Sequence, residues 1–133
     1  MERTPLEGIA AADAHLGRPV PLPTAPLPLA RWVEVVAVGP GAVEVEWNLD
    51  DSRPGAPGRL ALYAGAAPAP ERGLGDVVAR GRYAVRTAAL PEADASLRPV
   101  CELAWRQEGL HLRLTAQGSW AVDDLVAVAD SVR

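Results

Sequence analysis

Two pairs of alternating apolar runs, each joined by a short turn that contains glycine, constrain the fold of this 133-residue chain more than any other feature. Residues 32–38 and 42–47 flank Gly39-Pro40-Gly41, and residues 100–106 and 110–116 flank Gln107-Glu108-Gly109. Turns this short join antiparallel neighbours, whereas parallel strands need a crossover of a dozen or more residues. The sequence therefore predicts an antiparallel sheet built from hairpins.

Within these runs, side chains alternate in the way expected of strands with one buried face and one face in water. Residues 42–47 alternate Val43, Val45 and Trp47 with Glu44 and Glu46. In the second hairpin the apolar parity holds Cys101, Leu103, Trp105, Leu110, Leu112 and Leu114. We expect that parity to pack inward and His111, Arg113 and Thr115 to face the other way.

Two further strands are expected in the middle of the chain. Residues 59–64 form the third strand, with Leu60 and Leu62 facing inward. Residues 77–90 form a single fourth strand, on which Tyr83, Val85 and Thr87 share one parity and Arg80, Arg82 and Arg86 share the other. Prolines and glycines indicate loops at 50–58 and 66–75.

Helices are expected at both ends of the chain. Thr4 and Glu7 match a capping box with Pro5 at the first helical position, which predicts a helix over 5–16 that ends at Gly17. Apolar residues at helical spacing predict a second helix over 121–132, with Asp123 and Asp124 in its first turn. The predicted fold is a single α+β domain over 1–133: a curved antiparallel sheet of about six strands packed on an N-terminal and a C-terminal helix.

A connector of unusual composition lies between the first helix and the first hairpin. Residues 18–28 include five prolines, which exclude a helix and a central strand. Its apolar residues Val20, Leu22 and Leu27 are expected to anchor the connector on the core.

Composition excludes several classes of chemistry. The 13 cationic residues are all arginine, a usage that indicates high-GC coding and excludes every mechanism that needs a lysine. A net charge of -4 argues against a nucleic-acid partner. Cys101 is the only cysteine, so an intrachain disulfide and a multi-cysteine zinc site are excluded and a reducing compartment is expected. If Met1 is the natural start, the lack of a signal peptide and of an apolar run that could span a bilayer predicts a cytoplasmic protein.

The sequence shows no recognisable catalytic apparatus. It has no glycine-rich phosphate loop and no nucleophile motif, and its only histidines are His15 and His111. His15, near the end of the first predicted helix, needs no further role. The acidic cluster Glu44, Glu46, Asp50 and Asp51 is interpreted as a solvent-facing strand that leads into a turn. We therefore predict no enzyme, no cofactor and no metal.

Two groups of residues are candidates for binding. Arg80, Arg82 and Arg86, joined by Arg113 and with His111 on the same parity as Arg113, could clamp a carboxylate or phosphate. The same arginine stripe could instead form cross-strand pairs with Glu44 and Glu46. Trp32 and Trp120 fall at element boundaries, where they could rim a pocket or an interface.

Both ends of the chain resemble a known bacterial domain. The stretches that carry the likeness are 6–12 with 16–23, and Ala104-Trp105, 109–114 and 123–132. They are similar to the opening and closing segments of an uncharacterised domain found at the extracytoplasmic ends of bacterial anti-sigma-factor and sporulation-related membrane proteins and lipoproteins. The resemblance implies a fold and no active site, and this sequence departs from the family by lacking a membrane anchor.

These observations predict a non-catalytic domain that binds a small apolar or anionic molecule, or a protein, through its exposed sheet face or its tryptophan-bearing edge. One alternative is a small-ligand enzyme that uses His111 with arginines as anion clamps, for which His111 and a carboxylate would have to converge in one pocket. Another is a homodimeric structural protein with an apolar patch around Trp32 or Trp120.

Overall fold

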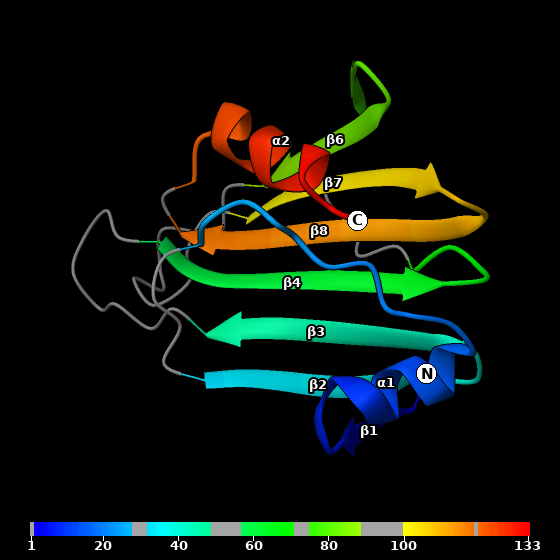
Figure 1. Ribbon diagram of the computed structural model, residues 1–133. Helices are drawn as coiled ribbons and strands as arrows, with labels where there is room; N and C mark the ends of the chain where they lie inside the picture. Colours follow the sequence, from blue (N-terminus) through cyan, green and yellow to red (C-terminus); the bar gives the residue numbers. More distant parts are fainter. Residues whose placement is uncertain (1, 28–31, 49–56, 71–74, 89–99, 119) are drawn as a thin grey trace.

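The computed structural model describes residues 2–27, 32–48, 57–70, 75–88, 100–118 and 120–133. Within them, eight strands form one open antiparallel sheet in the order β1-β2-β3-β4-β8-β7-β6-β5. The strands are β1 (Arg3–Leu6), β2 (Trp32–Val38), β3 (Ala42–Asn48), β4 (Pro57–Gly65), β5 (Val78–Arg80), β6 (Tyr83–Ala88), β7 (Val100–Gln107) and β8 (Leu110–Gly118). The helices are α1 (Gly8–Leu16) and α2 (Val122–Asp130). The predicted α+β class, with an antiparallel sheet and a helix near each end of the chain, is confirmed (Figure 1).

The sheet consists of two four-stranded meanders that meet where β4 pairs with β8. Both predicted hairpins are present, as β2–β3 and β7–β8. The turn of the second hairpin holds Glu108 at φ 51° and Gly109 at φ 82°. Positive φ at both central positions is typical of the two-residue turns that match the twist of paired strands.

Both helices lie on one face of the sheet (Figure 1). The apolar parity of the strands packs beneath them, as predicted, and Leu60, Leu62, Leu103, Leu112 and Leu114 are fully buried there. From α2 the same core receives Leu125, Val128 and Ala129. We call this side of the sheet the covered face.

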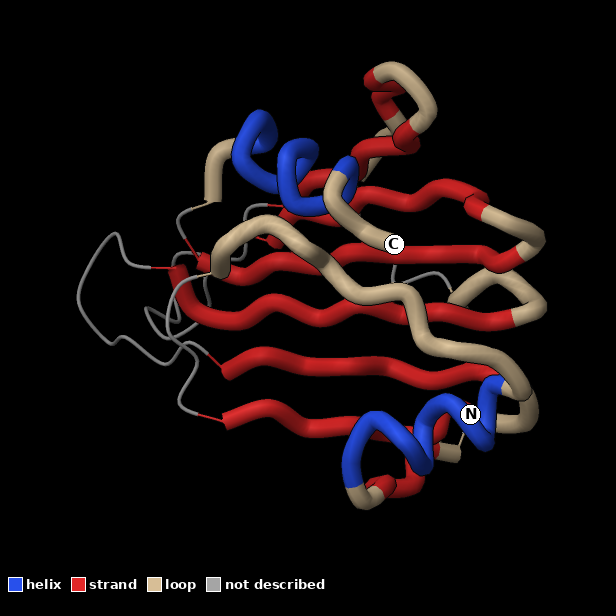
Figure 2. Tube along the Cα trace, in the orientation of Figure 1, coloured by secondary structure: helices blue, strands red, loops and turns tan. Residues whose placement is uncertain are grey.

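The described part of the proline-rich connector, residues 18–27, runs over the covered face between the two helices (Figure 2). Val20 is buried, and Leu22 and Leu27 pack against the core, which confirms the predicted anchoring. Leu22 exchanges backbone hydrogen bonds of 3.1 and 3.2 Å with Arg133 at the end of the chain. The connector thus takes part in the layer that seals the core.

The predicted start of the first helix is wrong. Residues 3–6 form β1, in which Thr4 lies opposite Ala37 of β2, and α1 begins only at Gly8. Glu7 makes no side-chain capping hydrogen bond. Antiparallel pairing with β2 supplies several backbone hydrogen bonds, which outweigh one local cap. The predicted end is confirmed, because Gly17 adopts φ 85° after Leu16.

The prediction of about six strands is also wrong, because the described residues form eight. One additional strand is β1, and the other arises because residues 77–90 do not form a single strand. Gly81 and Arg82 form a turn, with φ 59° at Gly81, so the segment folds into the hairpin β5–β6. Residues 89 and 90 lie outside the described part of the chain. A glycine within an apparent strand was the available signal, since it permits a reversal that other residues resist.

The second helix is close to its prediction. It spans Val122–Asp130 and carries Asp123 and Asp124 in its first turn. Neither α1 nor α2 is long and apolar enough to cross a membrane, and the structure describes no other α-helix.

Candidate binding site

The three arginines predicted to share one stripe lie on two sides of the sheet, so the stripe is wrong. Arg80, on β5, pairs with Asp123 of α2. Arg82, in the turn, donates to Tyr83 Oη at 3.1 Å, and Tyr83 in turn hydrogen bonds to Asp130 of α2. The turn at Gly81 breaks the strict alternation on which the prediction depended. Arg86, on β6, faces the other side.

Three of the four tryptophan side chains are described by the structure, and all three contact the core of the covered face. Trp105 is buried and meets Tyr83 edge to face, with ring centroids 5.2 Å apart, and Trp47 packs against the same core as expected. Trp120 is half-buried against the covered-face core. Trp32 pairs with Asn48 in the ladder, but its side chain lies outside the described set. A binding role for Trp32 or Trp120 stays a prediction.

The side of the sheet opposite the helices, which we call the open face, holds charged residues that are nevertheless buried. Glu44, Glu102 and Arg113 are 4%, 8% and 7% exposed. Glu44 accepts a hydrogen bond of 2.7 Å from Arg3, so the prediction that it faces solvent is wrong. Arg59 pairs with Glu46 at 2.9 Å, and Asp50 and Asp51 lie outside the described residues. Arg3 and Arg59, which the sequence analysis did not single out, supply these pairs.

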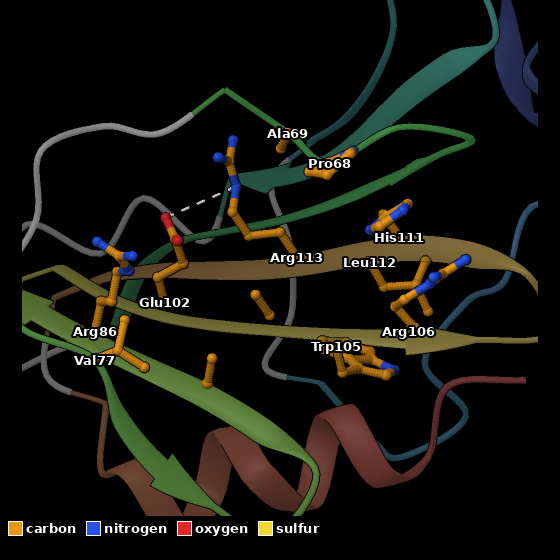
Figure 3. Close-up of a pocket in the computed structure, with 12 residues that line it drawn as sticks. Pro68, Ala69, Val77, Arg86, Glu102, Trp105, Arg106, His111, Leu112 and Arg113 are labelled. Carbon is orange, nitrogen blue, oxygen red and sulfur yellow. Dashed lines mark ion pairs between the residues drawn. The ribbon is translucent and has the colours of Figure 1, made fainter.

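A pocket of about 310 Å³ opens on this face over β6, β7 and β8 (Figure 3). Its polar lining consists of Arg86, Glu102, Arg106, His111 and Arg113, and its apolar lining includes Pro68, Ala69, Val77, Ala84 and Ala104. We call it the open-face pocket. Of the predicted candidates it brings together Arg86, His111 and Arg113 and excludes Arg80 and Arg82.

Arg113 ties the pocket to the segment that follows β4. Its Nη1 donates to the carbonyl oxygen of Pro70 at 2.7 Å, and its guanidinium lies 5.8 Å from the ring centroid of Tyr63. Tyr63 donates its hydroxyl to the carbonyl oxygen of Ala67 at 2.8 Å. Burial raises the pKa of Tyr63, opposed by the nearby Arg113 charge, so its hydroxyl stays protonated as a donor. These bonds hold the rim residues 67–70 over the open face.

Glu102 lies between two arginines of the pocket. Arg86 is its cross-strand neighbour on β6, and the Nε atom of Arg113 lies 3.8 Å from Glu102 Oε2 (Figure 3). That separation is an ion pair but exceeds hydrogen-bond length. Glu102 and Arg106 were missed in the sequence because β7 was interpreted through its apolar parity alone.

His111 lies at the end of the pocket away from Glu102, directly opposite Arg106 on β7. Glu102 is opposite Thr115, four residues along β8 from His111. A strand rises about 3.3 Å per residue, which separates the two positions by about 13 Å. A catalytic histidine needs its carboxylate partner within hydrogen-bond reach, and this spacing does not provide one. His15, in the last turn of α1, donates from Nε2 to the carbonyl oxygen of Gly39 at 2.8 Å, a structural bond.

The charge of the pocket is opposite to that of the chain. Three arginines against one glutamate leave a formal charge of +2 on the lining, whereas the whole protein carries -4. A second hollow of about 190 Å³ on the same face is lined by two arginines and two glutamates, Arg3, Arg59, Glu44 and Glu46, whose charges cancel. Only the open-face pocket, of these two, favours an anion.

Metal and thiol chemistry find little support in the described residues. They contain no cluster of three or more His, Cys, Asp or Glu side chains that could hold a metal ion. Cys101 is buried, and burial, followed by the Glu102 charge, raises the pKa of its thiol. A protonated, enclosed thiol is a poor nucleophile.

Comparison with known proteins gives no independent guide: no family model matches the chain, and no curated protein or solved structure was found to match it.

Proposed function

We propose that this protein is a non-catalytic binding domain whose open-face pocket takes a small organic anion with an apolar body. The observation that carries the proposal is the concentration of Arg86, Arg106 and Arg113 in one pocket of an acidic protein. Guanidinium groups bind carboxylates through paired charge-assisted hydrogen bonds. The pocket therefore attracts an anion, and Arg113 lies between the strand positions of Arg86 and Arg106.

The size and remaining lining of the pocket support an organic ligand. A volume of about 310 Å³ lies at the lower end of the range for small-molecule sites, about 300 to 1,000 Å³. Alanines of β6 and β7 and the Pro68-Ala69 segment add an apolar surface beside the arginines. An anion with a compact hydrocarbon part matches that combination better than a bare inorganic ion.

Binding is favoured over the alternative of catalysis by the placement of His111. Its strand position lies about 13 Å from that of Glu102, the carboxylate that shares its pocket. The single buried cysteine supports a reducing compartment such as the cytoplasm. The likeness to the extracytoplasmic bacterial domain stays a prediction about the fold.

The proposal is tested with ligands that differ in one property. We expect 3-phenylpropionate to bind more tightly than its neutral amide, 3-phenylpropanamide, and more tightly than acetate, because both the charge and the apolar body contribute. Amide chemical-shift titration of the labelled protein measures all three affinities. Perturbed signals should cluster at Ala104, Arg106 and His111.

Two arginine variants provide the matched comparison. Arg106 is exposed, so Arg106→Gln should leave the fold intact and weaken 3-phenylpropionate about tenfold, the loss expected for one charge-assisted bond. Arg82→Gln removes the same charge from outside the pocket and should leave the affinity unchanged. Equal weakening by both variants, or no saturable shift with any ligand, would refute the proposal.

A further inference from the structure

Glu102 is an unusual residue for a pocket that attracts anions. Its side chain is buried, yet Oε2 has no hydrogen-bond partner among the described residues. Buried carboxylate oxygens normally accept hydrogen bonds, because removing them from water without one is costly. An ionised carboxylate can only accept. Glu102 is thus a buried acceptor, placed in the lining of the pocket, whose hydrogen-bonding capacity is incompletely used.

A ligand that carried only a carboxylate would leave this acceptor unsatisfied and would also be repelled by it. We infer that the ligand of the open-face pocket is a hydroxycarboxylate, whose hydroxyl donates to Glu102 while its carboxylate engages the neighbouring arginines. This inference rests on the proposed function and adds the chemical class of the ligand. The terminal torsion of a glutamate is broad, so a small rotation presents either oxygen to the pocket.

The arginines beside Glu102 indicate which carbon of the ligand carries the hydroxyl. Arg86 faces Glu102 across the β6–β7 pair, and Arg113 Nε lies 3.8 Å from its Oε2. A carboxylate held by either arginine therefore lies in the part of the pocket that Glu102 also lines. A hydroxyl on the carbon next to the ligand carboxylate lies in that same part, which favours a 2-hydroxy acid.

A hydroxyl fits better than an ammonium group as the donor. The lining already carries a formal charge of +2, and an ammonium beside Glu102 would come close to the Arg113 guanidinium. Like charges at such separations repel strongly in a partly buried site. A neutral donor satisfies Glu102 without that repulsion.

Three ligands with one carbon skeleton test the inference: 3-phenyllactate, 3-phenylpropionate and phenylalanine carry a hydroxyl, a hydrogen and an ammonium at the same carbon. We expect 3-phenyllactate to bind about tenfold more tightly than 3-phenylpropionate, as a hydrogen bond to a charged acceptor provides. Phenylalanine should bind more weakly than 3-phenyllactate. Chemical-shift titration gives all three dissociation constants.

The variant Glu102→Gln separates recognition from a structural role. It preserves shape but makes the acceptor neutral, so the advantage of 3-phenyllactate should fall to about threefold. Because the lining becomes more positive, 3-phenylpropionate should bind a few-fold more tightly than to the wild type. A purely structural defect would weaken both ligands together. Glu46→Gln, on the same face but outside the pocket, is the control and should change neither affinity.

The outcomes distinguish this inference from the function on which it rests. Equal affinities of 3-phenyllactate and 3-phenylpropionate would overturn the hydroxyl inference and leave anion binding in place, with solvent satisfying Glu102. Tighter binding of phenylalanine would overturn the choice of a hydroxyl. Absence of binding by all three would overturn both proposals.

Discussion

The two faces of the sheet are built from the same strands but by different rules. On the covered face, Leu62, Leu103 and Leu114 lie side by side on β4, β7 and β8, fully buried beneath helices and connector. On the open face the same strands present Tyr63, Glu102 and Arg113, of which two carry charge, and all are less than 10% exposed. One face is closed by apolar packing, and the other buries charges in pairs.

The difference shows that the alternation of side chains along a strand determines which face of the sheet each side chain lies on. It does not determine whether that face is exposed to solvent. Alternation placed Glu44 and Arg113 correctly opposite the core, yet both are buried. Buried ion pairs contribute little net stability compared with apolar residues of similar volume. A face that retains them is therefore a better candidate for recognition than for holding the fold together.

The largest effect is expected on the covered face. Leu114 is completely buried between Leu62 and Leu103, so Leu114→Ala should lower the free energy of unfolding by about 3 to 4 kcal/mol through lost burial and a residual cavity. Urea denaturation measures the change. Val33→Ala, at a side chain that is 50% exposed, is the control and should cost about 0.5 kcal/mol. Similar losses of unfolding free energy for the two variants would contradict the prediction that Leu114 contributes more to stability than the exposed Val33.

A smaller effect is expected when one partner of the open-face pair is removed. Arg113→Met should lower the free energy of unfolding by about 2 to 3 kcal/mol, since it removes the cation that lies 3.8 Å from the buried Glu102 carboxylate and loses the bond to Pro70. The double variant Glu102→Leu with Arg113→Met should recover part of that loss, because no buried charge is then left behind. Urea denaturation of both proteins gives the comparison.

Recovery of stability together with loss of 3-phenylpropionate binding would show that the pair serves recognition. A double variant as unstable as Arg113→Met would mean instead that Arg113 acts mainly through the rim segment 67–70. Either result therefore shows whether the Glu102–Arg113 pair serves ligand recognition or the structure of the open face.

Much of the covered face could be predicted from the sequence. Both hairpins, the apolar parities of β4, β7 and β8, and the anchoring of the connector depend on local patterns that the structure keeps. One error arose where pairing over distance overrode a local signal, and another where the local signal of a glycine within an apparent strand was not used. Residues 3–6 pair with β2 although they look like a helix start, and the turn at Gly81 reverses a segment that reads as one strand.

The candidate site was only partly predictable, for the same reason. Arg86 joins His111 and Arg113 in the pocket because β6 pairs with β7 beside the predicted β7–β8 hairpin, and no local pattern specifies the β6–β7 pairing. Glu102 and Arg106 occupy the outward parity of β7, but their significance depends on what lies across the strand. Arg80 and Arg82 were misplaced because one turn changed their side of the sheet.

The smallest expected effect concerns the polar cluster between β6 and α2, on the covered side of the sheet. Tyr83 is 4% exposed, packs on Trp105 and hydrogen bonds to Asp130. Tyr83→Phe keeps the ring and removes only the hydroxyl, so it should cost about 1 kcal/mol at neutral pH. Thermal unfolding measures the loss.

The pH dependence of this variant sharpens the prediction. Burial, and then the hydrogen bond to Asp130, raise the pKa of Tyr83 above its usual 10.0. Since the native state favours the protonated phenol, the resulting stability is present below pH 10 and is lost as the pH rises through the native pKa. The cost of Tyr83→Phe should therefore shrink in alkaline solution, while Tyr63 and Cys101, whose pKa values are also raised, still make both proteins less stable there. A cost that stayed constant from pH 7 to about pH 11 would mean that Tyr83 ionises in the folded protein as readily as in the unfolded chain, and that the bond to Asp130 does not hold α2 against β6.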